Sequence, residues 1–168
     1  CSNYLSDDEA LSTLLDRVEG EVLTQANPIR FTTGGRKQQW VKNCIAVGLS
    51  SGFMEPLEST SIHLIQRSIL RFMQLMPNQQ ISQSDIDQFN RQADWEMTSI
   101  RDFLILHYYA NDRPDAFWTA CRNMAIPDSL QHKISLFRDT GRVFRENDEL
   151  FAENSWVQVM MGQGIMPQ

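Results

Sequence analysis

The chain has 168 residues, the length of one ordinary domain, and 42% of them are apolar, which excludes a disordered chain. Its 15 basic and 21 acidic residues give a formal net charge of −6, and Lys and Arg form no cluster, so nucleic acid is not an expected partner. The sequence has no apolar run of about 18 residues and no basic-then-apolar leader, so we expect neither a membrane span nor a signal peptide.

The three cysteines, Cys1, Cys44 and Cys121, are widely spaced, form no CxxC pair and are odd in number. This usage favours reduced thiols and a cytoplasmic location. The chain opens with Cys1 rather than Met, and residues 1–5 resemble the end of a strand. We therefore expect a segment of a longer protein.

A capping-box pair, Ser6 and Glu9, predicts the start of a first helix. Apolar residues then recur at helical spacing up to Val18, and Gly20 is a natural terminator. The predicted helix covers residues 7–19.

Two β-rich runs, residues 28–33 and 39–47, flank Gly34-Gly35. Because glycine readily adopts the positive φ of tight turns, the pattern predicts a hairpin that turns at this pair. Cys44–Val47 has no polar alternation and ends at Gly48, which is typical of a strand buried on both faces.

The remainder of the chain predicts helices. A long one begins near residue 58 and stops at Pro77, a second runs from Ser84 to about Tyr109, and shorter ones cover about 114–124, 128–140 and 154–161. The fold class is mainly α with a short N-terminal β element. We expect a strand and hairpin part over residues 1–56 and a helical part over residues 57–168.

The sharpest local feature is a loop of small residues, 48–52, followed by a helix start at Glu58-Ser59-Thr60-Ser61. Such a start leaves backbone N–H groups unpaired and carries about half a positive charge, so an anion can bind there beside the Glu58 carboxylate. The alternative is that Ser59 or Thr60 only caps the helix and that Glu58 is solvated.

The run from Trp40 to Ile62, which includes Gly52-Phe53-Met54-Glu55-Pro56-Leu57-Glu58-Ser59-Thr60-Ser61, resembles the signature of flavin-dependent tryptophan halogenases. Further matches extend the resemblance over essentially the whole chain: Leu5-Ser6-Asp7-Asp8-Glu9-Ala10, Arg101-Asp102-Phe103, His107-Tyr108, Phe117-Trp118, Gly162-Gln163-Gly164 and Met166-Pro167.

The resemblance implies an FAD enzyme in which reduced flavin and oxygen convert chloride or bromide into hypohalous acid. A lysine then receives the oxidant, and an electron-rich aromatic, tryptophan or another indole, is halogenated. Carried onto this sequence, Glu58 is the catalytic carboxylate beside that lysine, where it orients the halogenating species and accepts the ring proton. Thr60 and Ser61 offer backbone N–H groups to the halide, and Ser59 and Pro56 lie beside them at the cofactor.

Three parts of the family pattern are missing from these residues: a GxGxxG motif, a Trp-x-Trp-x-Ile-Pro motif and the lysine, since Lys37, Lys42 and Lys133 lie in other contexts. The resemblance places all three upstream. We therefore expect the C-terminal part of an α/β flavin-monooxygenase-like fold, which holds FAD mainly through the missing part and is inactive alone. A flavin reductase is an expected partner, and a homodimer is possible.

Two alternatives remain open: a helical binding module derived from this family, and a flavin-dependent hydroxylase. Trp156 either stacks on the substrate or packs in the core, and packing is the commoner role of such a residue. His63 and His107-Tyr108-Tyr109 are interpreted as structural residues that pack and cap helices.

Overall fold

The computed structural model describes residues 5–168 and divides the chain into two compact units, Cys1–Thr32 and Thr33–Gln168. The thiol of Cys1 and most of the strand end predicted at residues 1–5 lie outside the described residues. The predicted boundary between a β part and a helical part, at residues 56 and 57, lies within the second unit.

The first unit contains one helix, α1 (Asp7–Leu15). Its capping box is confirmed: the Ser6 hydroxyl accepts from the Glu9 N–H at 3.2 Å, and the Glu9 carboxylate accepts from the Ser6 N–H at 2.8 Å. The helix ends four residues earlier than predicted, and it contains no buried residue. Its apolar stripe therefore stays exposed, with Leu14 58% accessible.

The predicted hairpin is wrong. Gly34–Gly35 is itself a strand, β1, which pairs antiparallel with β4 (Gly52–Phe53), while β2 (Trp40–Val41) pairs with β3 (Cys44–Ile45). The tight turn lies at Lys42, whose φ of 55° supplies the left-handed conformation that the prediction assigned to the glycine pair.

The prediction that Cys44–Val47 is buried on both faces is also wrong, because Cys44 is exposed and the three residues after it are half-buried. The buried residue of this hairpin is Trp40, which is 1% accessible and meets Phe72 and Phe89 edge-on at 5.5 Å. The Asn90 amide oxygen accepts from the Trp40 N–H at 2.8 Å and so fixes the hairpin on the helices.

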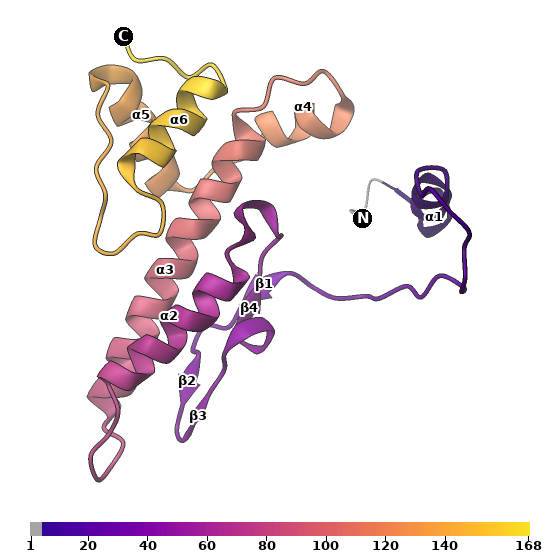
Figure 1. Ribbon diagram of the computed structural model, residues 1–168. Helices are drawn as coiled ribbons and strands as arrows, with labels where there is room; N and C mark the ends of the chain where they lie inside the picture. The colour runs from indigo at the N-terminus through magenta and orange to yellow at the C-terminus, as the bar shows by residue number, and fades with distance from the viewer. Residues whose placement is uncertain (1–4) are drawn as a thin grey trace. The chain divides into compact units, whose positions relative to one another are not determined.

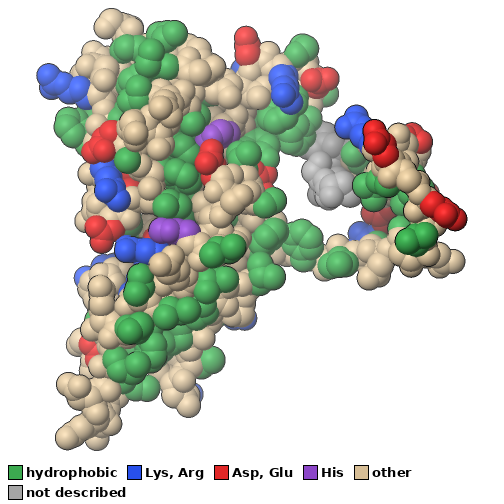
Figure 2. All heavy atoms as spheres, viewed as in Figure 1, with side chains coloured by type: hydrophobic (Ala, Val, Ile, Leu, Met, Phe, Trp, Pro, Cys, Tyr) green, Lys and Arg blue, Asp and Glu red, His purple; other side chains and the backbone are tan. Residues whose placement is uncertain are grey.

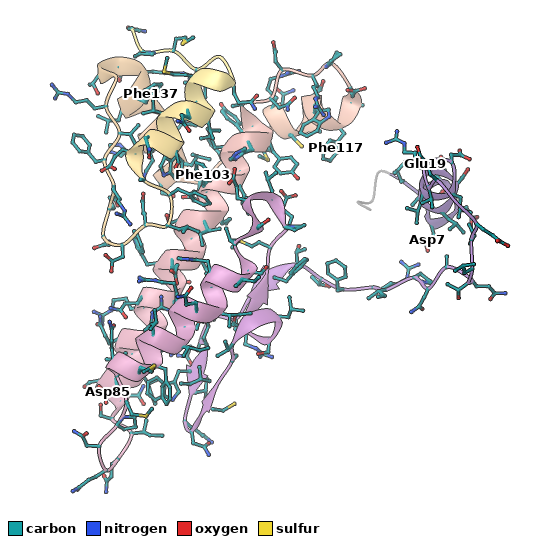
Figure 3. All side chains as sticks on the ribbon, viewed as in Figure 1. Asp7, Glu19, Asp85, Phe103, Phe117 and Phe137 are labelled. Carbon is teal, nitrogen blue, oxygen red and sulfur yellow. The ribbon has the colours of Figure 1, made fainter. Side chains whose placement is uncertain are left out.

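The helices of the second unit are α2 (Ser61–Gln74), α3 (Gln83–Tyr109), α4 (Ala116–Arg122), α5 (Asp128–Thr140) and α6 (Glu153–Gly162), with short 3₁₀ turns at Gly48–Ser50 and Leu57–Ser59. Figure 1 shows α3 as the long axis of this unit, with α2 and the strands beside its first half and α5 and α6 beside its second half. Figure 3 shows the side chains along these helices and strands as sticks. The mainly helical prediction is confirmed for this unit.

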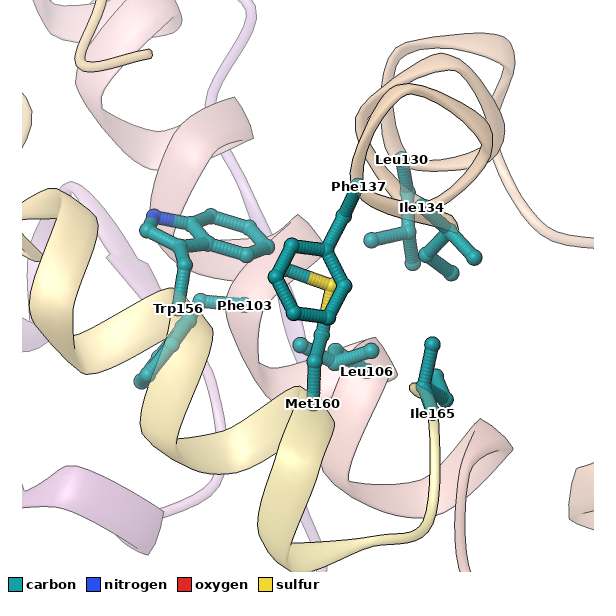
Figure 4. Packing of buried hydrophobic residues seen from close by; sticks show 8 residues of the cluster. All are labelled: Phe103, Leu106, Leu130, Ile134, Phe137, Trp156, Met160 and Ile165. Atoms are coloured by element: carbon teal, nitrogen blue, oxygen red, sulfur yellow. The ribbon is translucent and has the colours of Figure 1, made fainter. Parts of the chain in front are cut away.

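The main core lies where α3, α5 and α6 meet (Figure 4). Its buried side chains are Phe103, Leu106, Leu130, Ile134, Phe137, Trp156, Met160 and Ile165. Each contributes about 1.5–3 kcal/mol by leaving water, so this cluster fixes the second half of α3. A smaller cluster around Trp40 and Phe89 fixes the first half.

Helix α2 faces α3 with its polar side. Arg71, 6% accessible, donates to Glu96 at 2.6 Å, and Arg67 donates to the same carboxylate at 3.1 Å. The apolar side of α2 points outward, so Ile62 is 79% and Met73 62% accessible. Hydrophobic side chains gather over α2 and the strands beside it in Figure 2. An exposed apolar helix face of this kind is typical of a surface that packs against another apolar surface.

No helix among residues 5–168 is both long and apolar enough to cross a membrane. Cys44 and Cys121 are free thiols.

Candidate functional site

The turn between β4 and α2 has an unusual backbone. Glu58 and Ser59 have φ values of 66° and 52°, so two consecutive residues other than glycine adopt the left-handed conformation. Each such residue costs on the order of 1–3 kcal/mol and persists only where its surroundings hold it. Strained positions of this kind cluster at functional sites, which makes the turn a candidate site on geometry alone.

The end of α3 holds this turn through two adjacent residues. His107 Nε2 lies 3.3 Å from Glu58 Oε1, and the Tyr108 hydroxyl donates a short hydrogen bond to Glu55. Within the turn, the Ser59 N–H donates to the Pro56 carbonyl at 2.9 Å. The two carboxylates that flank Pro56 are therefore both anchored on one helix.

Burial, together with the hydrogen bond to Glu55 and the negative charge of that carboxylate, raises the pKa of Tyr108 to about 12. The phenol therefore stays protonated at neutral pH and remains a donor to the carboxylate. Its ring stacks on Trp118 of α4 at 5.6 Å, and Glu55 Oε1 is buried with no hydrogen-bond partner among the described residues.

The start of α2 leaves backbone donors available. Thr60, the N-cap residue, is 4% accessible, and its side chain makes no capping hydrogen bond. Ser61, the first helical residue, is exposed. The chain changes from the left-handed Ser59 to the right-handed Thr60, a combination that directs successive N–H groups into one concavity suited to an anion.

Five of the six predicted site residues thus lie together in this turn: Pro56, Glu58, Ser59, Thr60 and Ser61. Glu58 is 39% accessible, so its carboxylate lies at the surface of the described unit and is neither buried nor fully solvated.

The sixth residue, Trp156, lies in the core. It is 1% accessible, its ring meets Phe103 at 4.8 Å, and the Lys133 ammonium lies 4.4 Å from the ring centre. This position favours the packing role over stacking on a substrate.

A cavity of about 650 Å³ opens beside Glu55, between the β1–β4 pair and α3. Met97, Leu104 and Tyr108 contribute to its mainly apolar wall. Glu58 is not among the described residues that line it, so the cavity and the strained turn are neighbouring features that share only one end of the turn.

The sequence interpretation missed the contacts that His107 and Tyr108 make with the turn. Both were interpreted as packing and capping residues, and no local spacing links them to Glu55 or Glu58, because the contacts cross from α3 to a distant loop. His63, in contrast, lies 3.5 Å from the buried Glu96 carboxylate, as expected for a structural residue.

Comparison with known proteins identifies the family. The Tryptophan halogenase family model matches residues 1–168. The tryptophan 7-halogenase RebH of Lentzea aerocolonigenes is 30% identical over 99% of this chain and 34% of its own length. The tryptophan 6-halogenase ThaL of Streptomyces albogriseolus is 33% identical over 86% of this chain and 30% of its own length.

Solved structures agree with this result. A flavin-dependent halogenase from Xanthomonas campestris superposes with a TM-score of 0.90 at 55% identity, over 99% of this chain and 34% of its own. A second one, BrvH from Brevundimonas sp. BAL3, gives 0.90 at 44% identity, over 98% of this chain and 34% of its own. The chain spans about a third of the length of these relatives. It belongs to the tryptophan halogenase family.

Proposed function

We propose that this chain is the C-terminal part of a flavin-dependent halogenase that oxidises chloride or bromide to hypohalous acid and halogenates an electron-rich aromatic such as tryptophan or another indole. The strained turn carries the proposal, because the Glu58 carboxylate directly precedes a helix start that receives no side-chain cap from its N-cap residue among the described residues. Family membership supports the reaction class.

The residues of the turn have different roles in the proposed reaction. The N–H groups of Thr60 and Ser61 bind the halide at the positive end of α2. Glu58 orients the halogenating species and accepts the proton that the aromatic ring loses, so that the C–H bonding electrons return to the ring. Pro56 and Ser59 shape the loop that approaches the cofactor. The Ser59 N–H donates to the Pro56 carbonyl, and this hydrogen bond closes the loop.

Bound reduced flavin supplies, with oxygen, the oxidising equivalents for halide oxidation. The residues of this chain fit only a small part of the FAD site. The start of α2, where the N-cap side chain makes no capping hydrogen bond, can face the halide that binds beside the flavin, but the sequence has no dinucleotide-binding motif. The remaining two thirds of the protein would hold most of the FAD, in an α/β flavin-monooxygenase-like domain. A separate reductase would supply the reduced flavin, and the free thiols of Cys44 and Cys121 suit a cytoplasmic enzyme.

The outward apolar side of α2 supports this division. Its exposed apolar residues include one stripe, Ile62, Ile65, Ile69 and Met73, which Met76 continues just beyond the end of the helix. Because the relatives are about three times longer than this chain, we propose that the flavin-binding part of the same polypeptide covers the stripe. Replacing Ile69 by Glu in the full-length protein should then weaken the retention of FAD. If the stripe instead joins two copies of the protein, the same replacement would change the oligomeric state.

One assay separates the proposed reaction from its two rivals. The full-length protein is incubated with indole or tryptophan, FAD, a flavin reductase, NADH, oxygen and bromide or chloride, and the products are analysed by mass spectrometry. A halogenated product supports the halogenase. A hydroxylated product would identify a flavin hydroxylase, and tight binding of the indole without any product would identify a binding module.

A further inference from the structure

His107 lies in the last turn of α3, and its two ring nitrogens have different partners. Nδ1 lies 2.8 Å from the Phe103 carbonyl oxygen, and Nε2 lies 3.3 Å from Glu58 Oε1. The His107 side chain is 17% accessible, whereas that of Glu58 is 39% accessible, so the contact joins a largely buried ring to a carboxylate at the surface.

The first contact fixes the tautomer. A backbone carbonyl oxygen only accepts hydrogen bonds, so the proton of this contact belongs to Nδ1. A neutral ring would then present the lone pair of Nε2 to an ionised carboxylate, which also has only lone pairs to offer. The contact of Nε2 with Glu58 at 3.3 Å is therefore an ion pair when the ring carries a second proton, on Nε2.

The imidazole is also fixed in place by the core. The Phe103 ring meets it edge-on at 4.9 Å, and Phe103 itself stacks on Phe151 at 3.9 Å and contacts Trp156 at 4.8 Å. A row of packed aromatic rings thus connects the buried core to the exposed carboxylate of Glu58. Among the described residues, His107 is the one basic side chain recorded within ion-pair distance of Glu58.

We propose that His107 is a positioning residue for Glu58: its Nε2–H orients the carboxylate through Oε1, so that Oε2 faces the aromatic ring and accepts the proton that the ring loses. The role rests on the proposed function of Glu58. With Nδ1–H and Nε2–H both in place, the two side chains hold two protons before the aromatic ring is deprotonated and three after it. The third proton, on Oε2, returns to water.

Two replacements in the full-length protein test this role. His107→Phe keeps an aromatic ring but removes the donor to Glu58, and His107→Gln places an amide N–H close to the position of Nε2. Loss of a hydrogen bond to a charged group should lower kcat for halogenation by about 10- to 100-fold in His107→Phe, with KM within about twofold. His107→Gln should recover most of that loss. Hypohalous acid, measured by trapping with monochlorodimedone, should form at the normal rate in both.

A double-variant comparison separates positioning from general damage to the fold. If His107 acts through Glu58, adding His107→Phe to Glu58→Gln causes little further loss of kcat beyond that of Glu58→Gln alone. Replacing the exposed His132 by Gln is the matched control and should leave kcat unchanged.

Three outcomes would overturn the proposal: a normal kcat in His107→Phe, an equal loss in His107→Gln and His107→Phe, or additive losses in the double variant. Failure of the proposed function appears separately. In that case Glu58→Gln itself halogenates at the normal rate, whatever the histidine variants do.

Discussion

The buried carboxylate of Glu96 is the central contact between α2 and α3, and replacing it by Gln should loosen α2. Glu96 is 4% accessible and lies within ion-pair distance of Arg71, Arg67 and His63. In Glu96→Gln the Arg71 guanidinium, itself 6% accessible, keeps its burial but loses its counter-charge. Removing one partner of a buried pair costs about 3–5 kcal/mol, a large part of the about 5–15 kcal/mol that stabilises a typical domain.

Hydrogen–deuterium exchange of the amides of residues 61–74 in the full-length protein measures this loss locally. A cost of about 3 kcal/mol raises the amide exchange rate of α2 by roughly 100-fold, provided that the opening equilibrium of the helix sets this rate. Arg67→Gln is the matched control, because the Arg67 side chain is 35% accessible and its removal should cost at most about 1 kcal/mol. Equal effects of the two replacements, or unchanged exchange in Glu96→Gln, would refute the view that this carboxylate holds α2.

Three further predictions concern stability. Lys42→Gly should stabilise the protein by up to about 1 kcal/mol in thermal unfolding, since glycine adopts the φ of 55° without strain, whereas Lys42→Ala should not. Trp156→Ala should cost about 3–5 kcal/mol, because the ring is buried in the core, and a smaller loss would argue for a surface role. The pKa of Tyr108 is about 12 in the folded protein against an ordinary value of 10.0, so this residue favours folding below pH 10.0 and that contribution disappears as pH rises through 12. Ultraviolet titration of Tyr108→Phe should therefore lack one late-ionising tyrosine, and an unchanged titration would contradict the shift.

The helices were largely predictable from the sequence because their signals are local. The capping box at Ser6 acts as expected, and the helix predicted over 128–140 has those bounds in the structure, where it ends at Gly141 with a φ of 69°. The N-cap of α3, Ser82, lies two residues before the predicted start at Ser84, because the Ser-x-x-Asp pattern occurs twice and the structure uses Ser82 and Asp85. Such ambiguities change the ends of an element and leave its type intact.

The β part was not predictable in the same way. The pair Gly34-Gly35 gives a strong local turn signal, but the energy of the hairpin comes from burying Trp40 against Phe72 and Phe89, which are distant in sequence. That burial sets the register and places the turn at Lys42, a residue with little turn preference of its own.

The candidate site shows the same limit. Its residues lie in one continuous segment, so a resemblance to a family could find them from the sequence. The side chains that hold the segment, His107 and Tyr108, come from the far end of α3, and only the packing of that helix brings them to Glu58 and Glu55.

The most direct test of the account compares Glu58→Gln with Glu55→Gln in the full-length protein, by mass spectrometry of the halogenated indole. Both changes remove one carboxylate charge from the same turn, but Gln at position 55 can still accept from the Tyr108 hydroxyl. The account predicts that Glu58→Gln lowers the rate of halogenation by about 100-fold or more while Glu55→Gln stays within a few-fold of the wild type. Halogenation at the normal rate in Glu58→Gln would contradict the central claim that this carboxylate takes part in the reaction.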